Sequence, residues 1–348
     1  MKNFTDYTIY KEAICLDALR KLDYEKSNQT LFVLDEDEKL IGTVTDGDIR
    51  RGLLKGLTID TAIHLFSYPK FNFIKEKIDV SEIKRIKKNG IKLLPKLNES
   101  GQIEKVYDLS RLNSILPLHA VIMAGGRGQR LLPLTEKIPK SMLPLGNKPI
   151  IEHNIDQLIS YGIETITISV NYLSDQIMRF FGNGSAKGIC IEYLEEEKPM
   201  GTIGCLAQMK NIYNEAVLIL NSDIFTNIDF EEFYLDFENT DADMAVASIP
   251  YTVDIPYAIM ELNENTITSF KEKPKQTYYA NAGIYLIKSE KLSLIPKNSF
   301  YNATDLMDSI IMNKGKLIHS PITGYWIDIG KHDDYNKAKE IVKHLKNV

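Results

Sequence analysis

The sequence predicts an α/β protein: a Rossmann-like, mixed and mostly parallel sheet flanked by helices, preceded by a smaller α/β region. From residue 119 onward, short apolar runs alternate with amphipathic helical patterns, as in parallel sheets covered on both faces. The 348 residues are enough for two domains. A connector at residues 113–118, punctuated by Pro117, separates the two regions. We therefore expect one domain at residues 1–115 and a second at residues 119–348.

The composition excludes several classes of function. Hydrophobic residues make up 44% and charged residues 26%, with a net charge of −5, so the chain has no electrostatic reason to bind nucleic acid or an anionic membrane. No apolar run approaches the ~20 residues of a membrane span, and the first residues lack the apolar core of a signal peptide. The three cysteines and six histidines form no metal or redox spacing. We expect a cytoplasmic protein without nucleic-acid or membrane partners.

Residues 1–60 have the pattern of a small α/β unit. Apolar positions at helical spacing predict a helix over residues 13–21. Strands are predicted at residues 30–34 and 40–44, on either side of the charged turn at residues 35–38. The second strand leads through Thr45 and Asp48 into another helix. Asp48 can cap that helix or accept hydrogen bonds from ribose hydroxyls, and the sequence favours neither role.

Residues 61–115 repeat this order in a weaker form. Residues 62–66, 80–87 and 91–94 give helix and strand in the same succession, but the segment at residues 105–112 lacks the glycine and threonine of the first copy. Residues 75–96 carry eight basic and three acidic side chains, which favours a solvated helix face over a phosphate-binding patch.

The strand, Thr45, Asp48 and the following helix resemble the end of a CBS domain, and such domains occur in pairs. The resemblance implies that residues 1–115 are a CBS pair with a regulatory or dimerising role. It also implies that Thr45 and Asp48 contact a regulatory nucleotide, although the degenerate second copy weakens that expectation. A homo-oligomer is expected on the same ground.

The elements of the second region follow from alternating patterns. Helices are predicted at residues 150–160 and 174–181, each with a glycine just beyond its end. Strands are predicted at residues 165–170, 189–193 and 216–220. Ligands of such sheets gather at the carboxyl ends of the strands.

A glycine-rich loop follows the apolar run at residues 120–124. Its glycines leave little side-chain bulk, so that backbone N–H groups can close around an anionic oxygen. They are Gly125, Gly126 and Gly128. Arg130 adds a fork of donors suited to phosphate, and Lys140 adds a second cation. The glycines alone fit a tight turn equally well. The loop has neither the lysine of a Walker loop nor the last glycine of the dinucleotide-binding pattern.

Asp223 follows the strand at residues 216–220 after Asn221 and Ser222, on the same expected edge as the glycine loop. Magnesium prefers one or two carboxylates together with phosphate oxygens and water, so Asp223 is a candidate metal ligand. Its alternative role is that of a turn former. Two further motifs lie at residues 200–204, after an acidic run, and at residues 269–274. A charged, solvated turn is the alternative explanation of the second motif.

The segment GGRGQRL at residues 125–131, followed by Pro133, Pro139-Lys140 and LPLGNKP at residues 143–149, resembles the signature of sugar-1-phosphate nucleotidyltransferases. The resemblance runs through five ordered motifs over residues 119–348. Two positions depart from the family pattern: Gln129 stands where threonine is usual, and Ala258 stands where glycine is usual. The second departure leaves the identity of the sugar open.

The resemblance assigns roles to particular residues. It implies Mg²⁺ as cofactor, held by Asp223 and by Asp328 of a Trp-x-Asp-x-Gly motif. It implies a nucleotide site at Ala124, Gly125, Gly126, Gly128, Gly201 and Thr202. It implies a sugar-phosphate site at Glu272, Lys273 and Asn281. The catalytic set is then Arg130, Lys140, Asp223 and Asp328.

The implied reaction is an in-line attack of a sugar 1-phosphate oxygen on the α-phosphorus of a nucleoside triphosphate. Arg130 would hold the departing pyrophosphate, and Lys140 would stabilise the α-phosphoryl oxygens. A CBS pair ahead of this domain resembles bacterial guanylyltransferases that act on glucosamine 1-phosphate for nonulosonic (legionaminic) acid synthesis. We therefore expect GTP, while UTP, CTP and dTTP stay open.

Two other functional classes are alternatives to this reaction. One is a catalytically inactive regulatory protein that senses nucleotides, against which the intact cations and carboxylates argue. The other is a bifunctional enzyme with a hexapeptide-repeat acyltransferase domain, which is not expected because a single helix at residues 335–345 follows the motifs.

Overall fold

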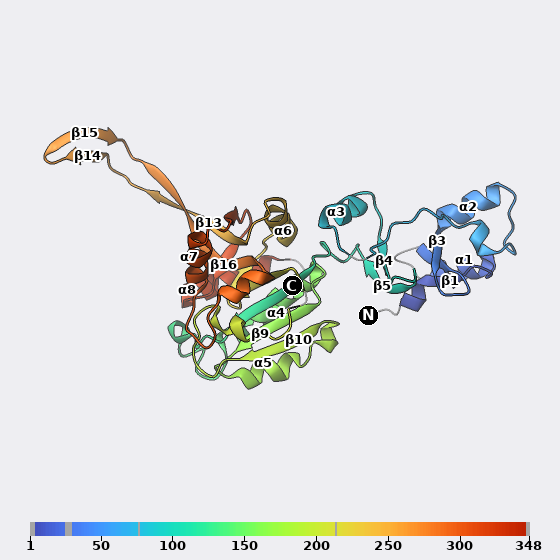
Figure 1. Ribbon diagram of the computed structural model, residues 1–348, viewed down its shortest axis with the longest axis horizontal. Helices are drawn as coiled ribbons and strands as arrows, with labels where there is room; N and C mark the ends of the chain where they lie inside the picture. Colours follow the sequence, from blue (N-terminus) through green and yellow to red (C-terminus); the bar gives the residue numbers. More distant parts are fainter. Residues whose placement is uncertain (1–3, 25–29, 76, 213, 346–348) are drawn as a thin grey trace. The chain divides into compact units, whose positions relative to one another are not determined.

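The structure is a computed structural model that describes residues 4–24, 30–75, 77–212 and 214–345 (Figure 1). The chain divides into two compact units. The N-terminal unit is Met1–Leu116 with Ser160–Gly162, and the C-terminal unit is Pro117–Ile159 with Ile163–Val348. Residues 1–3 and 346–348 of the predicted domains lie outside the described residues. Within the described chain, no helix is long and apolar enough to cross a membrane.

The first half of the N-terminal unit is a three-stranded sheet with two α-helices. Its strands lie in the order β1-β2-β3, with β1 parallel and β3 antiparallel to β2. The elements are η1 (Phe4–Tyr7), β1 (Thr8–Tyr10), α1 (Cys15–Tyr24), β2 (Thr30–Leu34), β3 (Leu40–Thr45), α2 (Asp46–Leu54) and η2 (Ile63–Leu65). Apolar residues of all three strands and both α-helices form one core.

The second half is smaller. Its described residues hold α3 (Val80–Lys88) and the antiparallel pair β4 (Leu93–Leu97) and β5 (Ile103–Asp108). A separate core cluster joins the two halves, because Phe32 and Leu34 of β2 pack with Leu93 and Leu97 of β4. The two halves therefore form one body, and the repeat that the sequence predicts within it stays a prediction.

The C-terminal unit is built on a seven-stranded sheet in the order β10-β9-β6-β11-β16-β13-β17. Every neighbouring pair is parallel except those made by β16, which is antiparallel to both β11 and β13. Its strands are β6 (Leu118–Ala124), β9 (Thr165–Val170), β10 (Cys190–Glu195), β11 (Ala216–Asn221), β13 (Met244–Asp254), β16 (Lys275–Lys288) and β17 (Leu317–Pro321). The predicted fold class, a mostly parallel sheet flanked by helices, is confirmed.

Helices and short strand pairs surround this sheet. The helices are α4 (Ile150–Ser160), α5 (Ser174–Phe181), α6 (Phe230–Asn239), α7 (Ala303–Met312) and α8 (His332–His344), with the 3₁₀ turns η3 (Gln129–Leu131), η4 (Lys140–Met142), η5 (Ser185–Lys187), η6 (Gly204–Gln208) and η7 (Ser289–Leu294). The short strands are β7 (Pro144–Leu145), β8 (Lys148–Pro149), β12 (Ile224–Thr226) and β18 (Trp326–Asp328). Leu306 and Ile310 of α7 pack on the sheet core, whereas Tyr335 and Ala338 of α8 pack beside Leu131 of the glycine loop.

A long two-stranded arm leaves the sheet. The outer parts of β13 and β16 stay paired from Ser248↔Asn281 to Asp254↔Lys275, and β14 (Ile259–Asn263) and β15 (Thr266–Lys271) form a hairpin beyond them. Figure 1 shows this hairpin carried away from the rest of the unit. We call residues 250–280 the arm; none of them is buried.

The elements with strong periodicity lie where the sequence predicts them. The helices at residues 150–160 and 174–181 and the strand at residues 165–170 match α4, α5 and β9. The strand predicted at residues 189–193 is shifted to Cys190–Glu195, because glutamates on an edge strand hide its true end. The sequence did not predict β1, which is only three residues long.

Candidate active site

Pairing of two short strands brings Asp223 and Asp328 together. β11 ends at Asn221, and β12 pairs antiparallel with β18 so that Ile224 lies opposite Asp328. The backbone N–H of Ile329 donates to the Asp223 carbonyl at 3.0 Å. Two carboxylates that are 105 positions apart in the sequence therefore share one rim, at the carboxyl end of β11.

Lys140 lies between these carboxylates. Its Nζ donates to Asp223 Oδ2 and lies 3.9 Å from Asp328 Oδ1. The Lys140 side chain is 13% exposed, whereas that of Asp328 is 48% exposed and open to a ligand. Burial, and then repulsion by the Asp223 carboxylate, raise the pKa of Asp328 above its usual value although Lys140 and Arg130 oppose the shift. Two carboxylates and two cations thus act on one another electrostatically.

The glycine loop runs beside Lys140. Gly128 has φ +62°, and a Cβ there would lie 2.9 Å from Lys140 Cβ, so only glycine fits. A Cβ on Gly126 would meet nothing within 4 Å, which leaves open space over that part of the loop. Ala124 is the buried end of β6 immediately before the loop. Gly128 therefore packs the loop against Lys140, and Gly126 faces space that a ligand can fill.

Arg130 reaches the same rim from η3. A Cβ built on Gly330 would lie 3.7 Å from the Arg130 guanidinium and 3.6 Å from Asp328 Oδ1, so both side chains border Gly330. A cavity of about 390 Å³ is lined there by Arg130, Trp326, Ile327, Asp328, Gly330, Lys331, Asp334 and Lys337. Three cations at its wall suit a polyphosphate.

Gly201 and Thr202 are held against the start of α7. Gly201 has φ +78°, and a Cβ there would lie 2.5 Å from the Tyr301 carbonyl oxygen. Thr202 Oγ1 accepts a hydrogen bond from the Ala303 N–H at 2.8 Å. Both residues thus have a packing role, and their predicted nucleotide contact stays a prediction.

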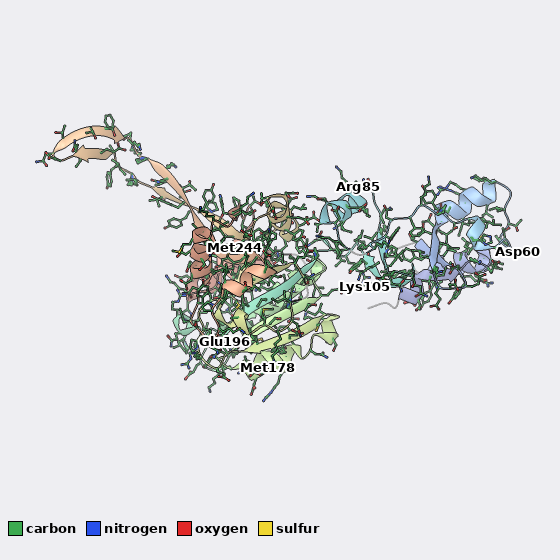
Figure 2. All side chains as sticks on the ribbon, in the orientation of Figure 1. Asp60, Arg85, Lys105, Met178, Glu196 and Met244 are labelled. Atoms are coloured by element: carbon green, nitrogen blue, oxygen red, sulfur yellow. The ribbon has the colours of Figure 1, made fainter. Side chains whose placement is uncertain are left out.

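Glu196 is a rim residue that was not among the residues predicted to form the site. It follows β10, and its Oε1 lies 3.0 Å from where Gly125 would carry a Cβ. Its carboxylate accepts from Ser169 Oγ at 2.5 Å and from the Met200 N–H at 3.3 Å. Figure 2 labels Glu196 among the side chains of this unit. The acidic run at residues 195–197 was visible in the sequence, but nothing there distinguished the glutamate that faces the glycine loop.

Asn281 lies at the rim, where its Oδ1 accepts from the Gly283 N–H at 2.8 Å. Gly283 in turn packs against Asn221, since a Cβ there would lie 2.6 Å from Asn221 Nδ2. Glu272 and Lys273 are instead on the arm. Lys273 precedes Asn281 by eight residues of mostly extended strand, so it lies about 25 Å along the chain from the rim. Within one copy, the structure does not bring the three predicted sugar-phosphate residues together.

The rim fits a hard divalent cation. The part of the chain that the structure describes holds no group of three or more His, Cys, Asp or Glu side chains that could enclose a metal. Two converging carboxylates with an open side are what Mg²⁺ uses when phosphate oxygens and water complete its shell. Burial and, after it, repulsion by Asp223 raise the pKa of Asp328, and a bound cation would offset both effects.

In the N-terminal unit, Thr45 and Asp48 form a capping box at the start of α2. Asp48 Oδ2 accepts from the Thr45 N–H at 2.9 Å, and Thr45 Oγ1 accepts from the Asp48 N–H at 3.3 Å. Arg51 also donates to Asp48 at 2.6 Å. A cavity of about 400 Å³ opens beside this turn, lined among others by Phe32, Thr45, Asp46, Lys70 and Lys92. Asp48 is a capping residue outside that lining, and Thr45 is part of it.

The family described as Nucleotidyl transferase matches residues 119–344 of the chain. The bifunctional protein GlmU of Methanococcus maripaludis (strain C7) is 32% identical over 223 residues, which cover 61% of this chain and 51% of that protein. This chain thus spans about half the length of that relative. The D-glycero-alpha-D-manno-heptose 1-phosphate guanylyltransferase of Aneurinibacillus thermoaerophilus is 30% identical over 232 residues, covering 65% of this chain and 99% of that protein.

Among solved structures, a putative glucose-1-phosphate thymidylyltransferase from Bacillus anthracis, in complex with a sucrose, is similar to this chain with a TM-score of 0.54. The two are 25% identical, and the similarity covers 66% of this chain and 97% of that one. The residues matched by the family, 119–344, include the glycine loop and the two rim carboxylates.

Proposed function

This chain belongs to the Nucleotidyl transferase family, and from that premise we propose that it transfers a nucleotidyl group from a nucleoside triphosphate to a sugar 1-phosphate and releases pyrophosphate. The observation that carries the proposal is the position of Lys140, between Asp223 and Asp328 and packed against Gly128 of the glycine loop. Such a loop with converging charges of both signs suits a polyphosphate and its counter-ion.

The chemistry needs positioning and charge neutralisation rather than a covalent intermediate. A phosphate oxygen of the sugar 1-phosphate bonds to the α-phosphorus, and the bond from that phosphorus to the pyrophosphate oxygen breaks. Lys140 neutralises charge on the α-phosphoryl oxygens, while Arg130 holds the leaving pyrophosphate in the cavity beside Asp328. The product is a nucleoside diphosphate sugar, a precursor for surface-glycan or nonulosonic acid synthesis.

We propose Mg²⁺ as the cofactor, held by Asp223 and Asp328. When bound, it supplies positive charge to phosphate oxygens and removes the repulsion between the two carboxylates. A requirement for added Mg²⁺ that chelation abolishes and Mg²⁺ restores would support this assignment.

GTP is the proposed nucleotide. Guanine offers an N1–H and an amino group side by side, and the Glu196 carboxylate next to Gly125 can accept from both. Uracil and thymine offer a single N–H on that edge. The relative from Aneurinibacillus, which is named a guanylyltransferase, supports the same base. A hexosamine 1-phosphate such as glucosamine 1-phosphate is the proposed acceptor, on the resemblance to guanylyltransferases preceded by a CBS pair.

For the N-terminal unit we propose a CBS-type pair that binds a regulatory nucleotide. The cavity beside Thr45 supports this, because Lys70 and Lys92 in its lining can meet a phosphate and the exposed ring of Tyr68 can pack on a base. The capping box already uses Thr45 and Asp48, so backbone groups at the start of α2 would carry more of the contact than the Asp48 side chain.

The deciding experiment is pyrophosphate release from GTP, UTP, CTP, dTTP and ATP against several sugar 1-phosphates, with and without Mg²⁺. We expect one productive pair, containing GTP and dependent on the metal. Triphosphate binding without turnover across the whole matrix would instead favour the nucleotide-sensing alternative.

A further inference from the structure

We propose that the arm acts on a second copy of this chain: it docks beside that copy's rim and delivers Glu272 and Lys273 to the site there. This inference rests on the proposed function, since it names where the sugar-phosphate contacts of that site come from. Four observations carry it, on the arm's surface, its charge, its reach and the groove that would receive it.

The arm carries an apolar face without a partner. In the hairpin of β14 and β15, Met260 lies opposite Phe270, and Leu262 lies opposite Ile267. Opposed residues of an antiparallel pair share one face, so these four side chains form a single apolar face, which we call the tip face. The opposite face is polar, with Glu261 paired to Lys271 at 3.3 Å.

The exposed surface is large enough for a specific interface. Ten large apolar side chains of the arm are exposed: Tyr251, Val253, Tyr257, Ile259, Met260, Leu262, Ile267, Phe270, Tyr278 and Tyr279. Together they expose roughly 1,000 Å² over both faces of the arm, an area of the same order as the about 800 Å² per partner that a standard interface buries. Figure 2 shows side chains along the whole arm with no other element against them. An isolated two-stranded hairpin is only marginally stable in water, so we expect another protein surface to pack on its apolar face.

The charges on the arm favour a second copy as the source of that surface. The arm carries four carboxylates and three lysines, so it is nearly neutral and attracts neither nucleic acid nor an anionic membrane. Its tip is acidic, with Glu261 and Glu264, whereas the lysines gather at residues 271–275. Charges of both signs also line the groove described below, where Asp333, Lys337 and Glu340 lie.

The arm begins at the rim and extends away from it, so Glu272 and Lys273 do not contact the rim of their own copy. β16 is antiparallel to both β11 and β13, so β11 and β13 run in the same direction. β13 therefore leaves the sheet at the edge where β11 ends. From Pro250 to Asn263 the arm extends by about 45 Å, the breadth of a domain of this size. Neither Glu272 nor Lys273 makes a hydrogen bond or ion pair with another described residue. They remain available to a ligand on another copy.

A groove suited to the tip face lies next to the active-site cavity. It has a volume of about 920 Å³, and its apolar lining includes Tyr325, Trp326, Ile327 and Ile341. It shares Trp326, Ile327 and Lys337 with the cavity that holds Arg130 and Asp328. Lys273 follows Phe270 by three residues across a bend in which Lys273 has φ +42°, so the two lie within about 10 Å of each other. Phe270 in the groove of one copy therefore places Lys273 at the adjoining phosphate cavity.

Complementation between two inactive variants tests the proposal. Asp223→Asn breaks the rim and leaves the arm intact, whereas Glu272→Ala/Lys273→Ala breaks the arm motif and leaves the rim intact. Full chains carrying the two changes are co-expressed with different tags, and the mixed dimer is isolated through both tags. One of its two sites then has an intact rim and an intact arm, so we expect about half of wild-type turnover per dimer.

A matched pair of rim variants is the control. Mixed dimers of Asp223→Asn with Asp328→Asn contain no intact rim, and we expect them to stay inactive. An inactive dimer of the rim variant with the arm variant would overturn the proposal, because it would show that each arm serves its own copy. Failure to recover any mixed dimer would overturn it as well.

Light scattering on the full-length wild-type chain tests docking without reference to catalysis. We expect the wild-type chain to be a dimer and the Leu262→Ser/Phe270→Ser variant to be a monomer. Ile259→Ser makes the same kind of change on the polar face, and we expect that variant to remain a dimer. If wild type releases no pyrophosphate with any substrate, the proposed function fails, and these masses still decide docking. A monomeric wild type, or one held together independently of the tip face, would contradict the inference.

Discussion

At the scale of single residues, Lys140 is the side chain on which the proposed chemistry depends most. It lies against Asp223 and Asp328 and is almost buried, so it is pre-positioned for charge that develops on the α-phosphoryl oxygens. We expect Lys140→Ala to lower kcat by roughly 10²–10³-fold while changing the KM for the triphosphate by less than about tenfold. Steady-state kinetics would show this difference.

Lys148→Ala is the control, because Lys148 pairs with Asp156 at 2.8 Å outside the rim. We expect that variant to retain turnover. An effect of Lys140→Ala confined to KM would assign Lys140 to ground-state binding alone.

Asp328 gives a prediction about stability and pH. Its pKa is raised by burial and by Asp223, so its ionised form is less favourable in the folded than in the unfolded chain. Removing the charge with Asp328→Asn should therefore raise Tm by about 1–3 °C at pH 7–8 in metal-free buffer. The gain should shrink as pH falls through the raised pKa and vanish below the ordinary pKa of about 3.9, where both states are protonated.

Thermal unfolding of wild type and variant across pH 3–8 measures this difference. Asp334→Asn, a neighbouring carboxylate that contributes less to the shift, is the comparison, with a smaller expected gain. A variant less stable than wild type at neutral pH would mean that the ion pair with Lys140 outweighs the repulsion.

Glu196 gives a prediction about base selection. Glu196→Gln keeps the size of the side chain but replaces one acceptor with a donor. We expect kcat/KM for GTP to fall by roughly 10–100-fold and that for UTP or dTTP to fall less. An equal loss for all bases would indicate that Glu196 only holds the loop through Met200 and Ser169.

At the scale of elements, the glycine loop allows a paired test. Gly128→Ala forces a Cβ against Lys140 at positive φ, so we expect a loss of about 1–2 kcal/mol of unfolding free energy together with activity. Gly126→Ala meets nothing in the protein, so we expect unchanged stability and a rise of about tenfold in the triphosphate KM. Denaturant unfolding and kinetics on both variants check these outcomes. Unchanged KM for Gly126→Ala would move the ligand away from that position.

The same scale shows what the sequence could predict. The apolar run ending at Ala124, the helix at residues 150–160 and the strand ending near Asp223 were found because burial imposes a strict period on them. The meeting of Asp328 with Asp223 came only from resemblance, since it depends on the three-residue strands β12 and β18. The position of Glu272 and Lys273 on an arm was not predictable. Apolar and polar residues alternate in exposed strands as they do in half-buried ones, so the sequence pattern does not indicate whether another element packs on the strand.

At the scale of the whole molecule, the N-terminal unit can be tested in the intact chain. Adenosine monophosphate lacks the triphosphate that the transferase site requires, so its binding measured by calorimetry would report on the cavity beside Thr45. We expect Lys70→Ala/Lys92→Ala to weaken that binding by roughly tenfold or more while leaving pyrophosphate release without the nucleotide unchanged. Lys55→Ala, at the far end of α2, is the control. Absence of binding to wild type would leave dimerisation as the role of this unit.

The register of the β13–β16 ladder shifts between Val246 and Ser248, close to where the buried part of β13 gives way to the exposed part. A shift of one residue resets which side of a strand each following side chain faces. Substitutions in the outer half of the ladder therefore need not disturb side-chain packing in the inner half. Changes beyond the shift that spare Glu272 and Lys273 can alter which copies recognise one another while Lys140, Asp223 and Asp328 stay unchanged. Two such enzymes in one cell could then keep their subunits separate without diverging in chemistry.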